Sequence, residues 1–596
     1  MNPKECLISI SDLSYLPLGI KERVLSNINL EVNRGDFVLL LGPSGCGKTT
    51  LTRCLNGLIP HLDQGTMDGT VRVKGKDTAS HEIYEFAQDI GMVFQNPDDQ
   101  ILSLKVVDEI AWGVENHGIP QAEIADRVNR AMNLLGIEEL KERLTFAISG
   151  GQKQKVSIAS NLAMMQDVLV LDDPTTDLDP VCTAEVVSTL AKLHHDMGKT
   201  LIVIEHDLND LIELANRIVF MNEGSILFDS PPVEVLSEHF NEVLALGMNI
   251  PQHVEIGRAI LDEDSKALLP VRKQEVFDLL DNFIEGTNVL FNYLPEPPKL
   301  GDLVLNVKEL NFSYIPGTPV LKDINFQIKQ GEFVAIIGAN GSGKSTLVKN
   351  LIGLIRQNTG QVTINGRDTS KIKISDLVSE IGYVFQDPDQ QLFANSVLEE
   401  VLFGLKMRHQ LDEQSEKRAL DTLKIVGLDN YVTRHPFSLS RGQRQKLAVA
   451  TALLHRPPIV LLDEPTTGQD RRSLEGLLDL LEDLNKHGNT TIMVTHDMDI
   501  VAAYATRIMV MDKGKIVMDG PSEEVFYDHY DYLDSLNLKP PTVIDFCKKL
   551  EHKGMPRFLT VDPLLQFIQE VRDNQKENHP QELLTYINSK SDKRKD

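Results

Sequence analysis

Hydrophobic and polar positions along the chain predict the same series of elements twice. Segments 8–15 and 304–314 alternate apolar and polar residues, which is typical of half-buried strands. Each is followed by a continuous apolar run that leads into a glycine-rich loop and an expected helix. Further apolar runs are typical of buried parallel strands flanked by helices. They lie at 168–173, 200–207, 459–464 and 491–497. The pattern therefore predicts an α/β core with an antiparallel β edge in each half.

The two halves are homologous modules. The segment Leu41–Ile59 returns as Ile337–Ile355, and other landmarks recur at a nearly constant spacing. An internal repeat of this kind decides how the whole fold is interpreted. Each core is followed by a weaker matching tail that predicts a small helical extension, and a proline-rich stretch separates the halves. We expect a first core at 1–240, its extension at 241–290, a connector at 291–301, a second core at 302–530 and a second extension with a tail at 531–596.

Composition and charge exclude several classes of protein. The 596 residues include 60 lysines and arginines against 87 aspartates and glutamates, a net charge of −27 that repels a phosphate backbone. We therefore expect no nucleic acid as a partner. The five cysteines are scattered without a C-x-x-C pair, which argues against a zinc site or a disulfide framework. No apolar run approaches the length that a membrane-spanning helix needs.

Two glycine-rich loops carry the first candidate chemistry. The pattern G-x-x-x-x-G-K-[ST] occurs at 42–49 and at 338–345, each time after an expected strand and before an expected helix. Such glycines turn backbone N–H groups toward phosphate oxygens, the lysine reaches the β and γ phosphates, and the hydroxyl ligates Mg²⁺. The sequence thus predicts two sites for ATP and Mg²⁺. The expected nucleotide-binding residues are Gly42, Ser44, Gly45, Gly47, Lys48, Thr49 and Thr50, and Gly338, Asn340, Gly341, Gly343, Lys344, Ser345 and Thr346.

Paired acids end a buried strand in each half. Asp172 and Asp173 follow one apolar run, and Asp463 and Glu464 follow the matching run. The first acid of a pair suits a ligand of the Mg²⁺ shell, and the second suits a base that polarises the attacking water. We therefore expect Asp173 and Glu464 to act in catalysis.

The segments Ile148–Gln152 and Leu439–Gln443 precede these acids at the same distance in both halves. Their sequences, ISGGQ and LSRGQ, resemble the signature motif of ATP-binding-cassette ATPases, and the resemblance covers both cores. It implies two P-loop nucleotide-binding domains, each with a RecA-like core, an antiparallel β subdomain and a helical signature subdomain. It also implies that the enzyme hydrolyses ATP to ADP and phosphate.

The resemblance assigns further roles residue by residue. It makes His206 and His496 the switch histidines, Asp179 and Asp470 the D-loop acids, and the aromatic rings that stack on adenine would be Tyr15 and Tyr314. The implied metal ligands are Thr49, Gln95, Asp172, Ser345, Gln386 and Asp463, where the two glutamines belong to the Q-loops. The signature residues expected to contact nucleotide are Ser149, Gly150, Gly151, Gln152, Ser440, Gly442 and Gln443.

In that family two cassettes pair head to tail, so this chain would form its own pair. Each nucleotide would then lie between the P-loop of one cassette and the signature motif of the other. Two departures from the family pattern converge on the site of Lys48: Asp173 replaces the usual glutamate, and Arg441 replaces the first signature glycine. We expect this site to bind ATP but turn over slowly, while the Lys344 site supplies most hydrolysis.

Segments 94–103 and 385–394 resemble the energy-coupling-factor group of these ATPases, although Leu102 stands where the second module has Phe393. That group drives uptake of vitamins or metal ions through a transmembrane coupling subunit and a separate substrate-capturing membrane subunit. The resemblance implies a peripheral location on the cytoplasmic face of the cell membrane. It does not identify the transported substrate.

Acidic residues beside the Q-loops have two interpretations: a solvated face, or a groove for basic helices of the membrane partner. They are Asp98, Asp99, Asp108, Glu109, Asp389, Glu399 and Glu400. The Q-loop neighbourhood favours the groove.

The main alternative function is that of a tandem cassette that acts on ribosomes as a translation factor. Such a factor needs a long basic helix pair between its halves to reach RNA, whereas the connector here is short, proline-rich and not basic. A DNA-repair or structural cassette protein needs a long coiled-coil insertion, and no heptad run is found.

Overall fold

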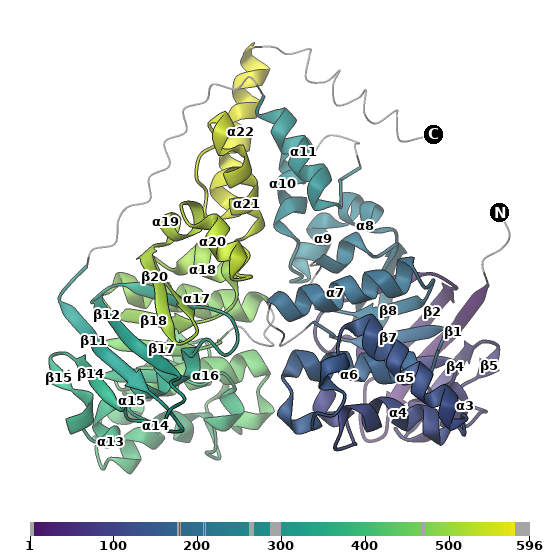
Figure 1. The fold of residues 1–596 in the computed structure, drawn as a ribbon, viewed down its shortest axis with the longest axis horizontal. Helices are drawn as coiled ribbons and strands as arrows, with labels where there is room; N and C mark the ends of the chain where they lie inside the picture. The colour runs from purple at the N-terminus through teal and green to yellow at the C-terminus, as the bar shows by residue number, and fades with distance from the viewer. Residues whose placement is uncertain are drawn as a thin grey trace. The chain divides into compact units, whose positions relative to one another are not determined.

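The structure is a computed structural model, and it describes residues 5–175, 178, 180–206, 208, 210–261, 268–285, 300–465 and 471–578. The chain divides into two compact units, Met1–Ile284 with Asn574–Asp596 and Glu285–Asp573 (Figure 1). The predicted connector begins a few residues after this division, and its residues 291–299 lie outside the described residues. None of the helices in the described ranges is long and apolar enough to cross a lipid bilayer.

The first unit contains two sheets. A four-stranded antiparallel sheet has the order β2-β1-β4-β5, and a six-stranded sheet has the order β10-β9-β3-β8-β7-β6, parallel except for β10. The strands are β1 (Cys6–Pro17), β2 (Leu25–Asn33), β3 (Phe37–Leu41), β4 (Gly65–Val73), β5 (Lys76–Asp77), β6 (Ile90–Val93), β7 (Val168–Asp172), β8 (Thr200–Ile204), β9 (Arg217–Asn222) and β10 (Ser225–Ser230).

Helices of the first unit are α1 (Lys48–Leu55), α2 (Leu58–His61), α3 (Ile83–Phe86), α4 (Val106–Asn116), α5 (Gln121–Leu135), α6 (Gly150–Ala163), α7 (Pro180–His195), α8 (Pro232–Glu238), α9 (Phe240–Ala245), α10 (Gln252–Leu261) and α11 (Lys273–Phe283). Short 3₁₀ turns are η1 (Pro97–Asp99), η2 (Glu138–Leu140), η3 (Thr145–Ala147) and η4 (Asp210–Glu213).

The second unit repeats both sheets, with the orders β12-β11-β14-β15 and β16-β17-β18-β13-β19-β20. Its strands are β11 (Leu303–Phe312), β12 (Leu321–Lys329), β13 (Phe333–Ile337), β14 (Thr359–Ile364), β15 (Arg367–Asp368), β16 (Ile381–Val384), β17 (Ile459–Asp463), β18 (Thr490–Val494), β19 (Arg507–Asp512) and β20 (Lys515–Pro521).

Helices of the second unit follow the same plan. They are α12 (Lys344–Leu351), α13 (Ile374–Leu377), α14 (Val397–Met407), α15 (Ser415–Ile425), α16 (Arg441–Leu453), α17 (Arg471–Lys486), α18 (Met498–Tyr504), α19 (Ser522–Tyr527), α20 (Tyr530–Ser535), α21 (Thr542–Leu550) and α22 (Val561–Asn578), with the 3₁₀ turns η5 (Thr369–Lys371), η6 (Pro388–Gln390), η7 (Asp429–Tyr431), η8 (Pro436–Ser438) and η9 (Glu551–Lys553).

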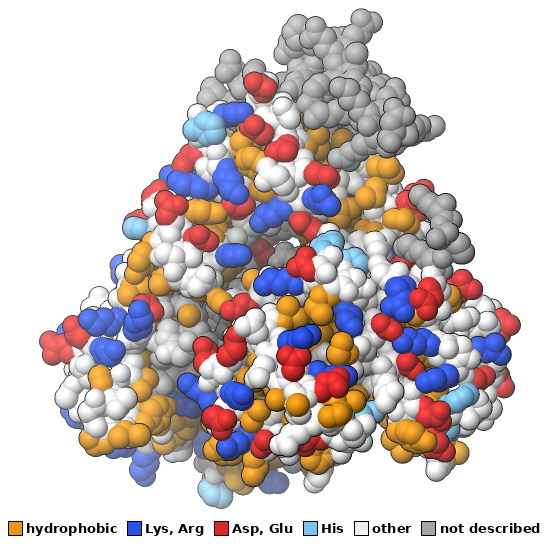
Figure 2. All heavy atoms as spheres, turned by 45° about the vertical axis from the view of Figure 1, so that its right-hand side comes forward, with side chains coloured by type: hydrophobic (Ala, Val, Ile, Leu, Met, Phe, Trp, Pro, Cys, Tyr) orange, Lys and Arg blue, Asp and Glu red, His pale blue; other side chains and the backbone are white. Residues whose placement is uncertain are grey.

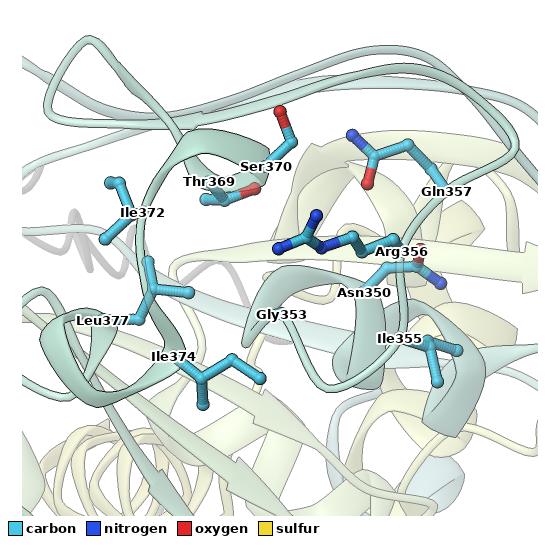
Figure 3. Close-up of a pocket in the computed structure, with 10 residues that line it drawn as sticks. All are labelled: Asn350, Gly353, Ile355, Arg356, Gln357, Thr369, Ser370, Ile372, Ile374 and Leu377. Atoms are coloured by element: carbon cyan, nitrogen blue, oxygen red, sulfur yellow. The ribbon is translucent and has the colours of Figure 1, made fainter.

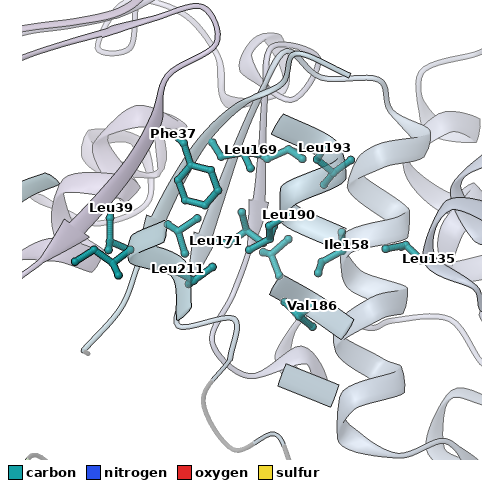
Figure 4. Close-up of a cluster of buried hydrophobic side chains, with 14 of the residues drawn as sticks. Phe37, Leu39, Leu135, Ile158, Leu169, Leu171, Val186, Leu190, Leu193 and Leu211 are labelled. Carbon is teal, nitrogen blue, oxygen red and sulfur yellow. The ribbon is translucent and has the colours of Figure 1, made fainter. Parts of the chain in front are cut away.

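Strand β3 shows why the parallel strands are continuously apolar. Phe37 and Leu39 belong to a core cluster shared with helices such as α6 and α7, while Val38 and Leu40 belong to a second cluster on the opposite face, shared with the antiparallel sheet. Figure 4 shows the first of these clusters. Because both faces of the strand are covered, every position is apolar.

The predicted fold class is confirmed. Apolar runs predicted as parallel strands form β7, β8, β17 and β18, the alternating segments form β1 and β11, and helices follow the core of each unit. Helix α10 begins directly after Pro251 and α21 directly after Pro541, as expected for matching extensions.

Leu171 tests the core of the first unit because it is fully buried on β7. Leu171→Ala should lower the free energy of unfolding by about 2–5 kcal/mol, since it removes apolar contacts and leaves a cavity. The matched control is Leu227→Ala on β10, because Leu227 is 45% exposed and its loss should change stability by only about 0.5 kcal/mol. Chemical unfolding curves of both variants provide the measurement, and equal shifts would contradict this placement of Leu171.

Candidate active site

The loop between β3 and α1 has a backbone that only glycine can follow. Gly42, Gly45 and Gly47 all have positive φ, at 147°, 79° and 108°. A Cβ on Gly42 would lie 2.1 Å from the carbonyl oxygen of Met221, so a side chain there would clash with the neighbouring strand. The second loop has the same geometry, with 2.3 Å between a Cβ on Gly338 and the equivalent backbone carbonyl. Glycine-rich turns of this kind can present backbone N–H groups to an anion.

Both P-loop lysines are folded back over their loops. Lys48 Nζ donates to the carbonyl of Gly42 at 2.6 Å, and Lys344 Nζ donates to that of Gly338 at 2.7 Å. The two side chains are buried and bring a positive charge to the start of α1 and α12, where backbone N–H groups already favour an anion. The other loop candidates lie on the same turns: Ser44, Gly45, Thr49, Asn340, Gly341 and Ser345 are exposed, Thr50 and Gly343 are half-buried, and Gly47 and Thr346 are buried.

The first acid of each pair lies at the end of its strand, but the two acids have different partners. Asp172 accepts a hydrogen bond at 3.0 Å from the hydroxyl of Thr49. Asp463 accepts one at 3.1 Å from the hydroxyl of Tyr383, a residue that sequence reasoning missed. Burial raises the pKa of Asp172, and the neighbouring Asp173 carboxylate adds to this shift. Burial also raises the pKa of Asp463, although the bond from Tyr383 opposes it.

The second acid of each pair lies beside the histidine predicted to be a switch residue. His206 Nε2 lies 2.9 Å from Asp173 Oδ2, and His496 Nδ1 lies 2.8 Å from Glu464 Oε2. Asp173 and Glu464 both adopt a left-handed backbone, with φ of 48° and 47°. Such strain at a non-glycine residue is typical of functional sites. Burial alone would lower the pKa of His496, but the hydrogen bond and charge of Glu464 outweigh it and raise this pKa.

Another buried acid, Glu205, precedes His206 and was not predicted. Its carboxylate accepts a hydrogen bond at 2.8 Å from the hydroxyl of Thr175, and Thr495 takes its place in the second unit. Asp179 and Asp470, predicted as D-loop acids, lie outside the described residues.

Tyr15 does not match Tyr314, so this prediction is wrong. On β1 Tyr15 lies opposite Leu25, whereas on β11 it is Phe312 that lies opposite the matching Leu321. Tyr15 is 3% exposed, and its hydroxyl donates at 3.2 Å to both backbone carbonyls of residues 63–64. The ring is therefore packed in the hydrophobic core and cannot stack on an adenine.

Tyr314 lies two residues beyond the end of β11 and is 56% exposed. Its ring stands edge-on to Phe312, with the ring centroids 4.8 Å apart. The residue two places beyond Tyr15 in the first unit is Pro17, which has no aromatic ring. Adenine stacking thus stays a prediction for Tyr314 alone.

Both signature motifs form a capping box at the start of a helix. Ser149 and Gln152 exchange hydrogen bonds at the start of α6, and Ser440 and Gln443 do so at the start of α16. Their side chains thus fix the helix ends that the sequence assigned to nucleotide contact. A Cβ on Gly150 would meet nothing within 4 Å. The matching position of the second motif can therefore hold the side chain of Arg441 without displacing neighbouring side chains of the same cassette.

The next glycine, Gly151, differs from Gly150 in the space around it. A Cβ on Gly151 would lie 2.5 Å from the sulfur of Cys182, so this position requires glycine. Gly442 is likewise buried near the start of α16. The signature motif therefore departs from its pattern only where its own fold permits it.

The predicted Q-loop glutamines Gln95 and Gln386 are exposed, and each follows the strand next to the one that ends in the acid pair. A second glutamine in each loop was missed. Gln100 accepts from the backbone of Phe94 and donates to that of Met92, and Gln391 accepts from the backbone of Phe385. These contacts fix the loop that carries the Q-loop glutamine.

Acidic residues beside the Q-loops do not form the predicted groove. Glu109 is buried, and one of its oxygens accepts the backbone N–H groups of Leu102 and Ser103 at 2.9 and 2.7 Å. Glu400 does the same for residues 393–394 at 2.8 and 2.7 Å. Both carboxylates hold their own loops and are closed to a partner.

Asp98 and Asp389 are also occupied within the cassette. Asp98 pairs with Lys153 at 2.5 Å, and Asp389 pairs with Arg444 at 2.6 Å. Because these basic residues belong to α6 and α16, the ion pairs connect each Q-loop to the signature helix of the same cassette. The exposed acids that remain are Asp99, Asp108 and Glu399.

A small cavity elsewhere in the second unit does not hold nucleotide. It lies at the far end of α12, lined among others by Asn350, Arg356 and Ser370 (Figure 3), and its volume of about 10 Å³ suits a single water molecule.

Comparison with known proteins agrees with this arrangement. The family model described as ABC transporter matches residues 25–176 and 321–467. A "Putative ABC transporter ATP-binding protein" of Methanosarcina mazei is 40% identical over 588 residues, which cover 96% of this chain and 99% of that protein. A protein of the same description from Caldanaerobacter subterraneus subsp. tengcongensis is 37% identical, covering 91% of this chain and 96% of that one.

Among solved structures, cbiO1 from Clostridium perfringens, described as part of the ABC transporter complex cbiONQ, is 38% identical. It covers 41% of this chain and 98% of its own, with a TM-score of 0.36. From the family model and the full-length relatives, the chain belongs to the ABC transporter family. It is an ATP-binding protein of that family with two cassettes, and its activity is that of an ATPase.

Glu400 tests how the loop at 393–394 is held. Glu400→Ala leaves the part-buried backbone N–H groups of Phe393 and Ala394 without their acceptor and should lower the free energy of unfolding by about 1–3 kcal/mol. The neighbouring Glu399→Ala is the matched control, because Glu399 is exposed and its loss should change stability by only about 0.5 kcal/mol. Thermal unfolding measures both, and a Glu400→Ala variant as stable as the parent would contradict the loop-holding role.

Proposed function

We propose that this ATPase energises an importer of the energy-coupling-factor type, which takes up a small nutrient such as a vitamin or a metal ion. The observation that carries the proposal is the cluster found in each unit: a folded-back lysine, a hydroxyl, an acid pair whose first member is buried, and a histidine. The runs around the Q-loops, which resemble that group of ATPases, support the importer assignment.

Both sites suit Mg²⁺ together with ATP. The ligands would be Thr49, Asp172 and Gln95 in one site and Ser345, Asp463 and Gln386 in the other. Oxygen ligands of this kind suit Mg²⁺, which keeps several waters and binds phosphates as well. The buried Oδ1 of Asp173 also accepts no hydrogen bond from any described residue, as expected where water or nucleotide completes a site. When bound, the ion offsets the negative charge of the phosphates.

The two cassettes of the chain are proposed to pair with each other, P-loop against signature motif. The start of α6 supports this because Gly150 faces open space, and the start of α16 presents Arg441 at the matching position. Each helix start offers backbone N–H groups that favour an anionic phosphate. ATP would hold the pair closed, and hydrolysis would release it.

Within this pair the two nucleotide sites are unequal. Asp173 has one methylene less than Glu464, so its carboxylate lies closer to its own backbone and farther from the substrate. A displacement of about 1 Å at a catalytic group can lower the rate roughly 10²-fold. We therefore assign the main hydrolytic step to Glu464 and His496, and a clamping role to the site of Lys48.

The membrane partner is proposed to dock on an apolar surface at each Q-loop rather than on acids. In the first unit this surface contains Leu102, Leu104 and Phe146, exposed by 72%, 70% and 70%. The hydroxyl of Thr145, next to Phe146, donates to the carbonyl of Ser103 at 2.8 Å and so connects the two segments. Exposed apolar patches of this kind mark interaction sites.

In the second unit Phe393 takes the place of Leu102 and is 58% exposed. Its ring meets that of Phe403 edge-on at 4.4 Å. A coupling helix of a transmembrane subunit would bury these rings, and the chain would then lie at the cytoplasmic face of the membrane. On the face shown in Figure 2, the described lysines and arginines are interspersed with acids rather than gathered into one stripe, so this face does not favour RNA.

Substitution of the two bases tests the unequal sites. Steady-state ATPase activity of Glu464→Gln should fall by roughly 10² or more, because a general base contributes at least about that factor. Asp173→Asn should keep more than half of the parent activity, as roughly expected if the Lys48 site turns over slowly. Equal losses of ATPase activity in both variants would contradict unequal sites, unless each substitution stops hydrolysis at both sites. Asp173→Glu distinguishes these outcomes, because it should raise turnover only if the shorter side chain limits the first site.

Photo-crosslinking tests the docking surface. A photoreactive phenylalanine analogue at position 393 should form an adduct with an integral membrane protein in cells that also express the cognate transmembrane subunit. The same analogue at Leu227, exposed on β10, is the control and should give no such adduct. Adducts with ribosomal proteins at position 393 would instead favour the translation-factor alternative.

A further inference from the structure

Tyr383 contacts the candidate metal ligand of the second cassette from the neighbouring strand. It lies on β16 opposite Leu461 of β17, and its hydroxyl donates to Asp463 Oδ2 at 3.1 Å. The ring is half-buried, and it packs against the ring of Phe385 with centroids 4.6 Å apart. The hydroxyl is therefore held in place by a strand and by a second ring.

Among the described residues of the first cassette, no hydroxyl makes the matching contact from the neighbouring strand. Met92 occupies the matching register on β6, opposite Val170 of β7, and a thioether has no proton to donate. The sulfur of Met92 instead accepts from the side-chain amide of Asn56 at 2.9 Å. Among the described residues, Asp172 accepts a side-chain hydrogen bond only from Thr49, on the P-loop side.

We propose that Tyr383 is a positioning residue of the second cassette, which fixes one oxygen of Asp463 and leaves the other for the Mg²⁺ shell. The inference rests on the proposed role of Asp463 as a ligand of that shell. A carboxylate side chain with two rotatable bonds loses rotamer entropy when it ligates a metal. A hydrogen bond that already fixes the carboxylate before the metal binds reduces that loss. The described residues of the first cassette include no such hydrogen bond to Asp172 from the neighbouring strand. This is a second difference between the two sites, besides the shorter side chain of Asp173 compared with Glu464.

Removal of the hydroxyl alone is the experiment that tests this contact. Tyr383→Phe keeps the ring and its packing, and Tyr383→Met introduces the residue of the first cassette. The full-length chain carries Lys48→Ala in addition, so that the second P-loop dominates nucleotide binding. Mn²⁺ stands in for Mg²⁺, and its binding is titrated by electron paramagnetic resonance in the presence of a non-hydrolysable ATP analogue.

In both Tyr383 variants the dissociation constant of Mn²⁺ should rise about ten-fold, the lower end of what loss of a hydrogen bond to a metal ligand produces. Affinity for a fluorescent ATP analogue in EDTA should stay within about two-fold, because the proposed effect acts through the metal. Met92→Leu, the matched change in the first cassette, should leave Mn²⁺ binding at the second site unchanged.

Parental Mn²⁺ affinity in Tyr383→Phe would overturn the proposal, and so would an equal loss of metal-free nucleotide affinity, which indicates a packing role only. Asp463→Asn separates this result from failure of the proposed function. If Asp463→Asn also keeps the parental Mn²⁺ affinity, the metal site itself is wrong. If it weakens Mn²⁺ binding while Tyr383→Phe does not, only the role of Tyr383 fails.

Discussion

Parallel pairing of three buried strands decides where the chemistry of each cassette lies. Strand β3 pairs with β8 and β8 pairs with β7, so the P-loop, the switch histidine and the acid pair all follow the carboxyl ends of adjacent strands. The second unit repeats this order with β13, β18 and β17. Ligands of open α/β sheets bind at this edge. The apolar strands therefore do more than fill the core, since a shift of one residue in their register would separate the lysine from the acids.

The same scaffold carries two sites with different side chains. Asp173 and Glu464 share a left-handed backbone and a histidine partner, yet they differ by one methylene. Asp172 is bonded by the P-loop threonine, and Asp463 is bonded by a tyrosine of the adjacent strand. Arg441 occupies the position in the second signature motif that Gly150 occupies in the first, where a Cβ would meet no atom within 4 Å. These differences lie in side chains, while the strand order of the two units is the same, and this is how a duplicated fold can specialise.

Local patterns predicted most of the fold and the phosphate-binding elements. The P-loops, the acid pairs and the apolar strands are short motifs whose chemistry follows from residues close together in sequence, and the structure brings them together as expected. Tyr15 was assigned by residue identity, but strand register makes it the counterpart of Phe312. A bulge or a loop of different length changes the spacing between repeats, which residue identity cannot reveal.

Interactions between distant segments were the part that the sequence did not predict. Glu109 and Glu400 have the same charge as their exposed neighbours, and only the fold turns them inward to accept backbone N–H groups. The hydroxyl of Tyr383 on β16 reaches Asp463 at the end of the adjacent strand β17. The ion pairs of Asp98 and Asp389 depend on where helices α6 and α16 pack. Such contacts require three-dimensional neighbours that hydrophobic periodicity does not specify.

We propose that two nucleotide sites on one chain bind ATP, but that only the site of Lys344 turns it over rapidly. The most direct measurement is the nucleotide content of the protein after incubation with Mg²⁺ and a photoreactive ATP analogue, with each cross-linked peptide assigned to its cassette. We expect intact triphosphate on the first cassette and diphosphate on the second. Diphosphate on both cassettes in equal amounts, formed at equal rates, would contradict it.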